Sequence, residues 1–167
     1  MQLSYLDLSF TNLRNCDFSN CQAIETIFHC SELSNCTFAD AHLERASFRE
    51  AKLNKVSFER AHMAFVDLTK TRGKEVNFFR ARMNEADLRD SELINANFTE
   101  ADLTRGLTDR ANLTGATQLH AALHFGINNV NGEGRPRPVG DMVNVELGVG
   151  GPGAVGAAGG PLQQNDF

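Results

Sequence analysis

The sequence contains none of the short motifs that mark the common enzyme classes. There is no GxSxG nucleophile turn, no P-loop, no HExxH zinc helix and no Rossmann glycine fingerprint. The glycine-rich segment GVGGPG follows no strand-to-helix pattern, so it does not predict phosphate binding. We therefore expect a protein that is not an enzyme and that has no cofactor.

Long apolar segments are also missing. No run of about 18 apolar residues is present, and the start, MQLSYLDLSF, lacks the basic and apolar regions of a secretory signal. The sequence predicts no membrane span and a cytoplasmic location. The alternative is delivery into a host cell by a specialised secretion system, whose signals this test does not detect. A formal net charge of −5 is too small to indicate direct binding to nucleic acid.

Cysteine is scarce and shows no zinc-binding pattern. The four cysteines include no CxxC pair, and no histidine stands at zinc-ligand spacing from them. Cys16, Cys21 and Cys36 fall where the repeat described next usually has alanine. This placement favours reduced, buried thiols, as in a cytosolic protein.

The sequence does contain a repeat of five residues. In ASFREAKLNKVSFERAHM, residues 46–63, a small residue and a large apolar residue each recur every five positions. This register holds from Leu3 to Leu123, and a small residue stands two places before almost every large one. Because both inward positions recur within five residues, the chain has to turn after every unit. A repeat this short and this regular is typical of a solenoid.

Residues twenty apart sort into columns of similar side chains. One column is entirely phenylalanine (Phe18, Phe38, Phe58, Phe78 and Phe98), and another is mostly leucine. A coil of three units would instead mix the two types in every column. The sequence therefore predicts an all-β solenoid with four units per coil, stacked at a strand spacing of about 4.8 Å.

The units ADLRD, ANFTE, ADLTR and ANLTG resemble the pentapeptide-repeat proteins, whose consensus is similar to A(D/N)Lxx. The resemblance covers about residues 1–125. It implies a right-handed quadrilateral β-helix of about six coils, a rod about 30 Å long at strand spacing. Gly73, Thr108 and Gln118 depart from the pattern at the large position, and there we expect the inward side chain to be absent or polar.

From Gly126 onward the composition changes. This segment holds all four prolines and 11 of the 14 glycines, which predicts a flexible, largely disordered tail. Only DMVNVELGV, residues 141–149, alternates like a strand, and it is a candidate cap for the open coil end. We expect a repeat unit over residues 1–125 and a tail over 126–167. The open ends also permit an end-to-end dimer, so the oligomeric state stays undetermined.

Charge is distributed in three blocks, which total −4 over residues 1–43, +5 over 44–82 and −4 over 83–125. In one interpretation, outward residues twenty apart alternate in sign and pair across the coils, as in the series Glu50, Lys70, Asp90 and Arg110. In the other, the middle block is a basic belt that docks an acidic partner. Its candidate contact residues, with two outward phenylalanines, are Arg49, Lys52, Lys55, Arg60, Lys70, Arg72, Lys74, Phe65 and Phe79.

The function predicted is a non-enzymatic protein-interaction or structural scaffold of bacterial type, with an unidentified protein partner. The resemblance also implies a role as a module of a secreted effector. The alternative is a DNA mimic that binds DNA gyrase or another type II topoisomerase, as quinolone-protection members of the family do. The basic belt interrupts the acidic surface that such a mimic needs.

One pair of histidines raises the question of a metal. His42 and His62 share an outward column, one coil apart. Two such histidines are more typical of a solvated surface than of a metal site. The sequence therefore predicts no metal.

Overall fold

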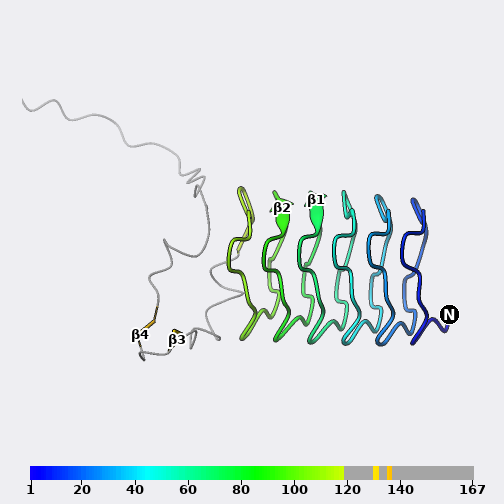
Figure 1. The fold of residues 1–167 in the computed structure, drawn as a ribbon, viewed down its shortest axis with the longest axis horizontal. Coiled ribbons are helices and arrows are strands. Elements are labelled where there is room, and N and C mark those ends of the chain that lie inside the picture. The colour runs from blue at the N-terminus through cyan, green and yellow to red at the C-terminus, as the bar shows by residue number, and fades with distance from the viewer. Residues whose placement is uncertain (119–129, 132–134, 137–167) are drawn as a thin grey trace, which may run out of the picture.

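The computed structural model describes residues 1–118, 130–131 and 135–136, and Figure 1 shows the coils stacked along one axis with the N-terminus at one end. The strands are β1 (Arg72–Lys74), β2 (Glu92–Ile94), β3 (Val130–Asn131) and β4 (Arg135–Pro136). β1 pairs with β2 in parallel and β3 pairs with β4 antiparallel. The described residues form no helix, so none of them lies in a helix that could cross a membrane.

Parallel backbone bridges join residues twenty apart along the stack, from Gln2↔Gln22 to Asn97↔Thr117. In β1 and β2 the same separation pairs Gly73 with Leu93. These contacts confirm that one coil takes twenty residues, which is four units of five.

Each unit turns two residues after its large inward residue. The non-glycine residues at these corners have a φ between 54° and 65°, for example Asn35 (61°) and Asp40 (56°). At most corners the next N–H closes the turn, as when Ala41 donates to the Phe38 carbonyl at 3.1 Å. A non-glycine residue in this left-handed region costs on the order of 1 kcal/mol. The turns therefore depend on the surrounding stack for stabilisation.

The aspartate or asparagine of the repeat has a structural role at these turns. The Asp67 carboxylate accepts the Thr69 N–H at 2.9 Å, and the Asn97 side-chain oxygen accepts the Thr99 N–H at 3.0 Å. In these two units the bonded N–H makes no hydrogen bond to a neighbouring coil. The side chain thus satisfies the backbone donor that coil stacking leaves unpaired.

Both predicted inward positions are buried in every unit from Cys21 to Leu103. In the phenylalanine column the Phe38 and Phe58 rings stack with centroids 5.3 Å apart, and so do those of Phe58 and Phe78. Phe48, in the adjoining column, meets Phe38 edge-on at 5.6 Å and Phe58 at 5.3 Å. The predicted phenylalanine stack is therefore confirmed, and it interlocks with a second aromatic column.

The cysteines agree in part with the sequence prediction. Cys21 and Cys36 are buried, and Cys16 is half-buried in the first coil. Burial raises the pKa of the Cys21 and Cys36 thiols. All four cysteines are free thiols.

The three departures from the repeat behave differently. The core is closed at Gly73, because a Cβ added there would lie 2.7 Å from Val76 Cγ2 and 3.0 Å from the Leu53 carbonyl oxygen. Thr108 is buried as a polar inward residue. Gln118 is exposed with a φ of 56°, so the inward side chain is absent there, as expected. The predicted boundary at residue 125 and the strand over 141–149 lie outside the described residues.

Candidate interaction surface and side-chain clusters

The predicted basic belt is divided among several faces of the coil stack. Four of its residues share the face outside Leu53 and Gly73, and we call them the basic face: Lys52, Lys55, Arg72 and Lys74. Arg49 and Lys70 lie on the preceding face, and Arg60 lies on the following one, beside the phenylalanine column. The structure therefore brings four of the seven basic candidates together.

The three candidate basic residues outside the basic face each lie within 4.0 Å of a carboxylate. Arg60 donates two hydrogen bonds to Asp40, each of 2.8 Å. Lys70 Nζ lies 3.9 Å from Glu50 Oε1, and Arg49 Nε lies 3.5 Å from the same oxygen. These cations are largely neutralised by the protein itself.

Pairing between coils continues further along the stack. Arg110 donates two hydrogen bonds to Asp90, of 2.5 and 2.8 Å, and Arg80 donates one to Glu100 at 2.6 Å. The hydrogen bond from Arg110 holds the pKa of Asp90 below its usual range. The predicted pairing across coils is thus confirmed for Glu50 with Lys70 and for Asp90 with Arg110.

The basic face is different because most of its charge has no counterpart. Lys52 lies 3.5 Å from Glu32. Lys55, Arg72 and Lys74 are exposed, and none has a carboxylate within 4.0 Å among the residues that the structure describes. Glu75 is the one acidic residue that shares this face in the same two coils. Positive charge here is left for solvent or for a partner.

The two phenylalanine candidates lie on other faces. Phe65 is 47% exposed, and the Arg45 guanidinium lies 5.7 Å from the centre of its ring. Phe79 is half-buried, with the Arg80 guanidinium 4.9 Å from its ring centre. Neither ring belongs to the basic face, and arginine partly covers both.

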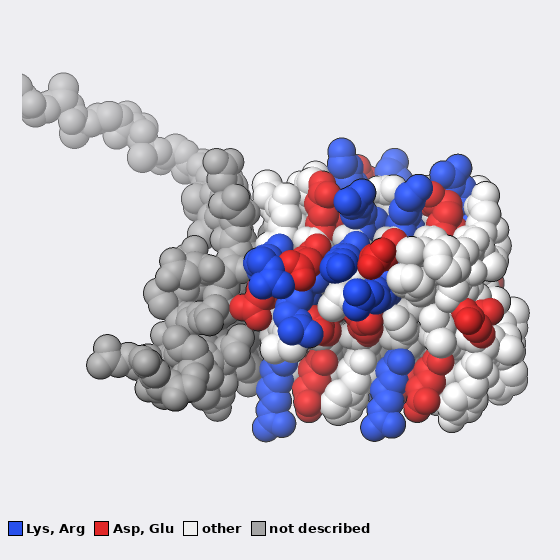
Figure 2. Space-filling model, viewed as in Figure 1, with Lys and Arg blue, Asp and Glu red and all other residues white. Residues whose placement is uncertain are grey.

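The space-filling view shows the same mixture of charges. In Figure 2, basic and acidic side chains interleave over the middle coils. The surface towards the N-terminal end, at the right, is mostly uncharged with isolated acidic groups. On this side of the molecule no continuous acidic surface forms.

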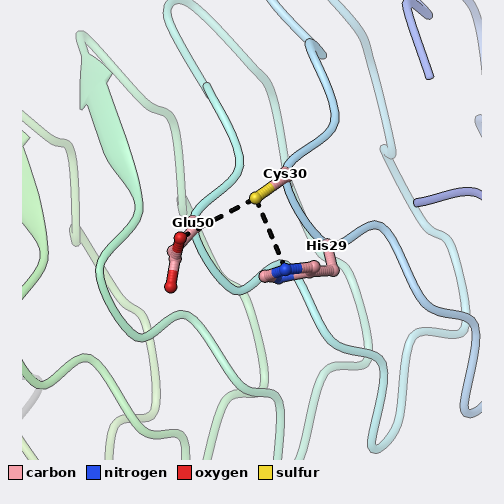
Figure 3. A group of neighbouring side chains, drawn as sticks. All are labelled: His29, Cys30 and Glu50. Carbon is pink, nitrogen blue, oxygen red and sulfur yellow. Dashed lines mark hydrogen bonds between the residues drawn. The ribbon is translucent and has the colours of Figure 1, made fainter. Parts of the chain in front are cut away.

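A cluster of His29, Cys30 and Glu50, which no motif in the sequence indicates, converges from neighbouring coils (Figure 3). Cys30 Sγ lies 3.4 Å from His29 Nε2 and 3.7 Å from Glu50 Oε2. A search for zinc-ligand spacing could not find it, because Glu50 follows Cys30 by one full coil. The twenty-residue columns, which place Glu50 after Cys30, were the available signal.

A second cluster contains the two histidines considered above. His42 and His62 lie side by side with ring centres 4.7 Å apart, which confirms their shared column. Their Nδ1 atoms lie 3.5 and 4.0 Å from Glu44 Oε1. Glu44 Oε2 is buried and has no hydrogen-bond partner among the described residues.

Comparison with known proteins agrees with the repeat architecture. A family model described as pentapeptide repeats matches in eight copies, over residues 2–40, 41–72 and 74–106. The gap between the last two segments falls at Gly73. No curated protein sequence matches the chain.

Several solved structures are similar to this chain at low sequence identity. One is a pentapeptide repeat protein of the Arabidopsis thaliana thylakoid lumen (23% identity, TM-score 0.34, covering 66% of this chain and 67% of that one). Another is HetL of Nostoc sp. strain PCC 7120, involved in heterocyst differentiation regulation (20% identity, TM-score 0.33, covering 69% of this chain and 72% of that one). A third is QnrB1, a plasmid-mediated fluoroquinolone resistance protein (14% identity, TM-score 0.45, covering 87% of this chain and 80% of that one).

Proposed function

Since this chain belongs to the pentapeptide-repeat family, we propose that it is a non-enzymatic interaction module that binds an acidic protein surface through the basic face. The observation that supports this proposal is the contrast in pairing. Arg60 and Lys70 are matched by carboxylates, whereas Lys55, Arg72 and Lys74 have none within 4.0 Å among the described residues.

The backbone beneath the basic face is well suited to presenting these charges. Arg72 and Lys74 are the ends of β1, which pairs in register with β2. The Lys74 N–H also donates to the Asn54 side chain of the preceding coil at 3.1 Å. A fixed backbone lowers the ordering cost of binding, and unpaired cations steer an acidic partner towards the face.

The proposal is tested with a defined acidic probe and two charge-matched variants. The test variant carries Lys55→Glu, Arg72→Glu and Lys74→Glu, and the control carries Arg49→Glu, Arg60→Glu and Lys70→Glu. Binding of fluorescently labelled poly-glutamate is measured by anisotropy, with urea unfolding to confirm that both variants fold. We expect the test variant to bind at least about tenfold more weakly than the control, because the three cations that it lacks are the ones without a carboxylate partner in the native protein.

An equal loss in both variants would mean that only net charge matters, which would contradict a defined docking face. The same three proteins then serve in a pull-down. A partner of the proposed kind is retained by the native chain and the control, and is lost with the test variant.

The DNA-mimic alternative predicts a different result. A mimic needs a continuous acidic surface, but basic residues interleave with acidic ones over the middle coils (Figure 2). In a gyrase supercoiling assay with and without a quinolone, we expect no protection by the purified protein. Protection would replace the proposal made here.

We further infer a right-handed quadrilateral coil that continues to residue 125, followed by a separate tail over residues 126–167. For location, we propose a bacterial cytoplasmic scaffold, and the alternative is delivery as a secreted-effector module.

The boundary at residue 125 is supported by the repeat register, which runs to Leu123. Limited proteolysis should leave a resistant fragment that ends near residue 125. Early cleavage within the repeats would contradict the boundary.

A further inference from the structure

We propose that His29, Cys30 and Glu50 form a binding site for a divalent transition-metal ion, with Zn²⁺ as the expected occupant. One ligand atom from each of the three residues lies within 4.8 Å of the other two. The donors that we assign are Cys30 Sγ, a Glu50 carboxylate oxygen and His29 Nε2, which is 3.4 Å from that sulfur. Imidazole, thiolate and carboxylate are the ligands that zinc uses in proteins. The site is independent of the basic face and of the partner proposed for it.

The hydrogen bonds of His29 fix its tautomer in the form that binds metal. His29 Nδ1 lies 3.1 Å from the Arg49 carbonyl oxygen. A carbonyl oxygen only accepts hydrogen bonds, so Nδ1 carries the hydrogen, and in the neutral imidazole Nε2 then presents its lone pair. A backbone carbonyl bound to the opposite ring nitrogen is the usual support of a metal-binding histidine. Phe10 also packs edge-on against this ring, with centroids 5.3 Å apart.

The distances are already close to those of a tetrahedral zinc site. Zinc bonds of about 2.3 Å to sulfur and about 2.1 Å to nitrogen or oxygen give tetrahedral S···N and S···O separations of about 3.6 Å. The two corresponding distances here are 3.4 Å, to His29 Nε2, and 3.7 Å, to Glu50 Oε2 (Figure 3). Little rearrangement of Cys30 is therefore needed, and a fourth position remains for water.

One proton does not satisfy the groups that converge here. His29 Nε2 and Glu50 Oε2 both accept hydrogen bonds, whereas the Cys30 thiol supplies a single proton between them. A metal ion would replace that proton and contact all three groups at once, and the thiol proton would pass to solvent. Because Cys30 and Glu50 belong to consecutive coils, the ion would also join the two coils.

Some of the surrounding charges favour binding of a metal ion, and others oppose it. Burial, followed by the negative charge of Glu50, raises the pKa of the Cys30 thiol, which is therefore protonated without metal. Asp7 is close enough to His29 for a Coulombic interaction and adds negative charge. Arg49 and Lys70 compete for Glu50 at its other oxygen, 3.5 and 3.9 Å away. Removing Lys70 should consequently strengthen binding.

The His42, Glu44 and His62 cluster is the competing location for an ion. Bonds of about 2.1 Å give a tetrahedral nitrogen-to-oxygen separation of about 3.4 Å. The His42 distance of 3.5 Å is near this value, whereas the His62 distance of 4.0 Å exceeds it. This cluster contains no cysteine, so spectroscopy separates the two clusters.

The test is a titration of the reduced full chain with Co²⁺, followed by displacement with Zn²⁺. We expect the near-ultraviolet charge-transfer absorption of a Co²⁺–thiolate bond, which Zn²⁺ abolishes. Cys30→Ser should remove the absorption, His29→Gln and Glu50→Gln should weaken binding about tenfold or more, and Lys70→Gln should strengthen it. Zn²⁺ should also raise the melting temperature of the native chain.

Two control variants keep the result specific. Cys16→Ser, which changes a half-buried thiol outside the cluster, and the pair His42→Gln and His62→Gln should leave the absorption unchanged. Urea unfolding of the apo proteins identifies any variant that fails to fold. No thiolate absorption, or absorption that survives Cys30→Ser, would overturn the proposal. Cobalt binding lost only in the His42 and His62 variant would place the ion at the other cluster.

Discussion

The phenylalanine column and the neighbouring column through Leu53 and Gly73 share the same coils but differ on both sides of the backbone. Inside, one stacks rings such as Phe58 and Phe78 at 5.3 Å, whereas the other contains a glycine whose space is closed by Val76. Outside, Arg60 beside the phenylalanine column is paired with Asp40. The basic face has three cations without a carboxylate within 4.0 Å among the described residues.

This difference shows that the outward side chains of one coil can differ from face to face. On both faces the backbone bonds between coils join residues twenty apart, so side chains are free to vary once the inward volume is filled. Stacked rings and paired charges contribute stability on one face. Unpaired charges on the other contribute little stability but remain available for binding.

The largest expected effect comes from breaking the phenylalanine stack. Phe58 is fully buried and stacks on Phe38 and Phe78. Phe58→Ala should lower the free energy of unfolding by about 3–5 kcal/mol, because it removes a buried ring and leaves a cavity. Urea unfolding measures the change, and Phe58→Leu should recover most of it. A loss below about 1 kcal/mol would contradict a tightly packed column.

A smaller effect is expected from restoring the repeat consensus at Gly73. Because a Cβ there would lie 2.7 Å from Val76 Cγ2, Gly73→Leu should destabilise the protein by about 1–3 kcal/mol despite matching its column. The double variant with Val76→Ala should regain part of that loss, as measured by urea unfolding. Stabilisation by Gly73→Leu alone would show that the position contains unfilled space.

The smallest effect concerns Glu32, the carboxylate that lies 3.5 Å from Lys52 of the basic face. Burial raises the pKa of Glu32, but hydrogen bonds from Arg14 and Ser34 outweigh it and lower the pKa to about 2. A folded pKa below the unfolded one gives stability that is present above about pH 5 and is lost as the pH falls towards 2.

Glu32→Gln should therefore reduce the difference in urea midpoint between pH 5 and pH 3. Glu92→Gln is the control, in the same outward column three coils further along. Glu92 has no cation within 4.0 Å of its carboxylate among the described residues, so this variant should preserve that difference. The same difference in urea midpoint between pH 5 and pH 3 in all three proteins would mean that the Glu32 carboxylate is not stabilised by its neighbours.

Some features follow directly from the order of residues. The five-residue register, the twenty-residue coil and the phenylalanine stack were predictable because inward volume repeats with a fixed period. The lack of space for a side chain at Gly73 was not predictable, since the sequence does not show that Val76 packs against this position. The His29, Cys30 and Glu50 cluster was also missed, because its members meet only across a coil boundary.

The sequence alone determined which residues point inward and which residues lie above one another, since both depend on counting along a regular path. The tertiary structure decided which outward charges are paired and where donor atoms converge. Side chains on neighbouring coils reach one another over only a few ångströms, so their conformations decide whether Arg60 finds a carboxylate and Lys74 does not.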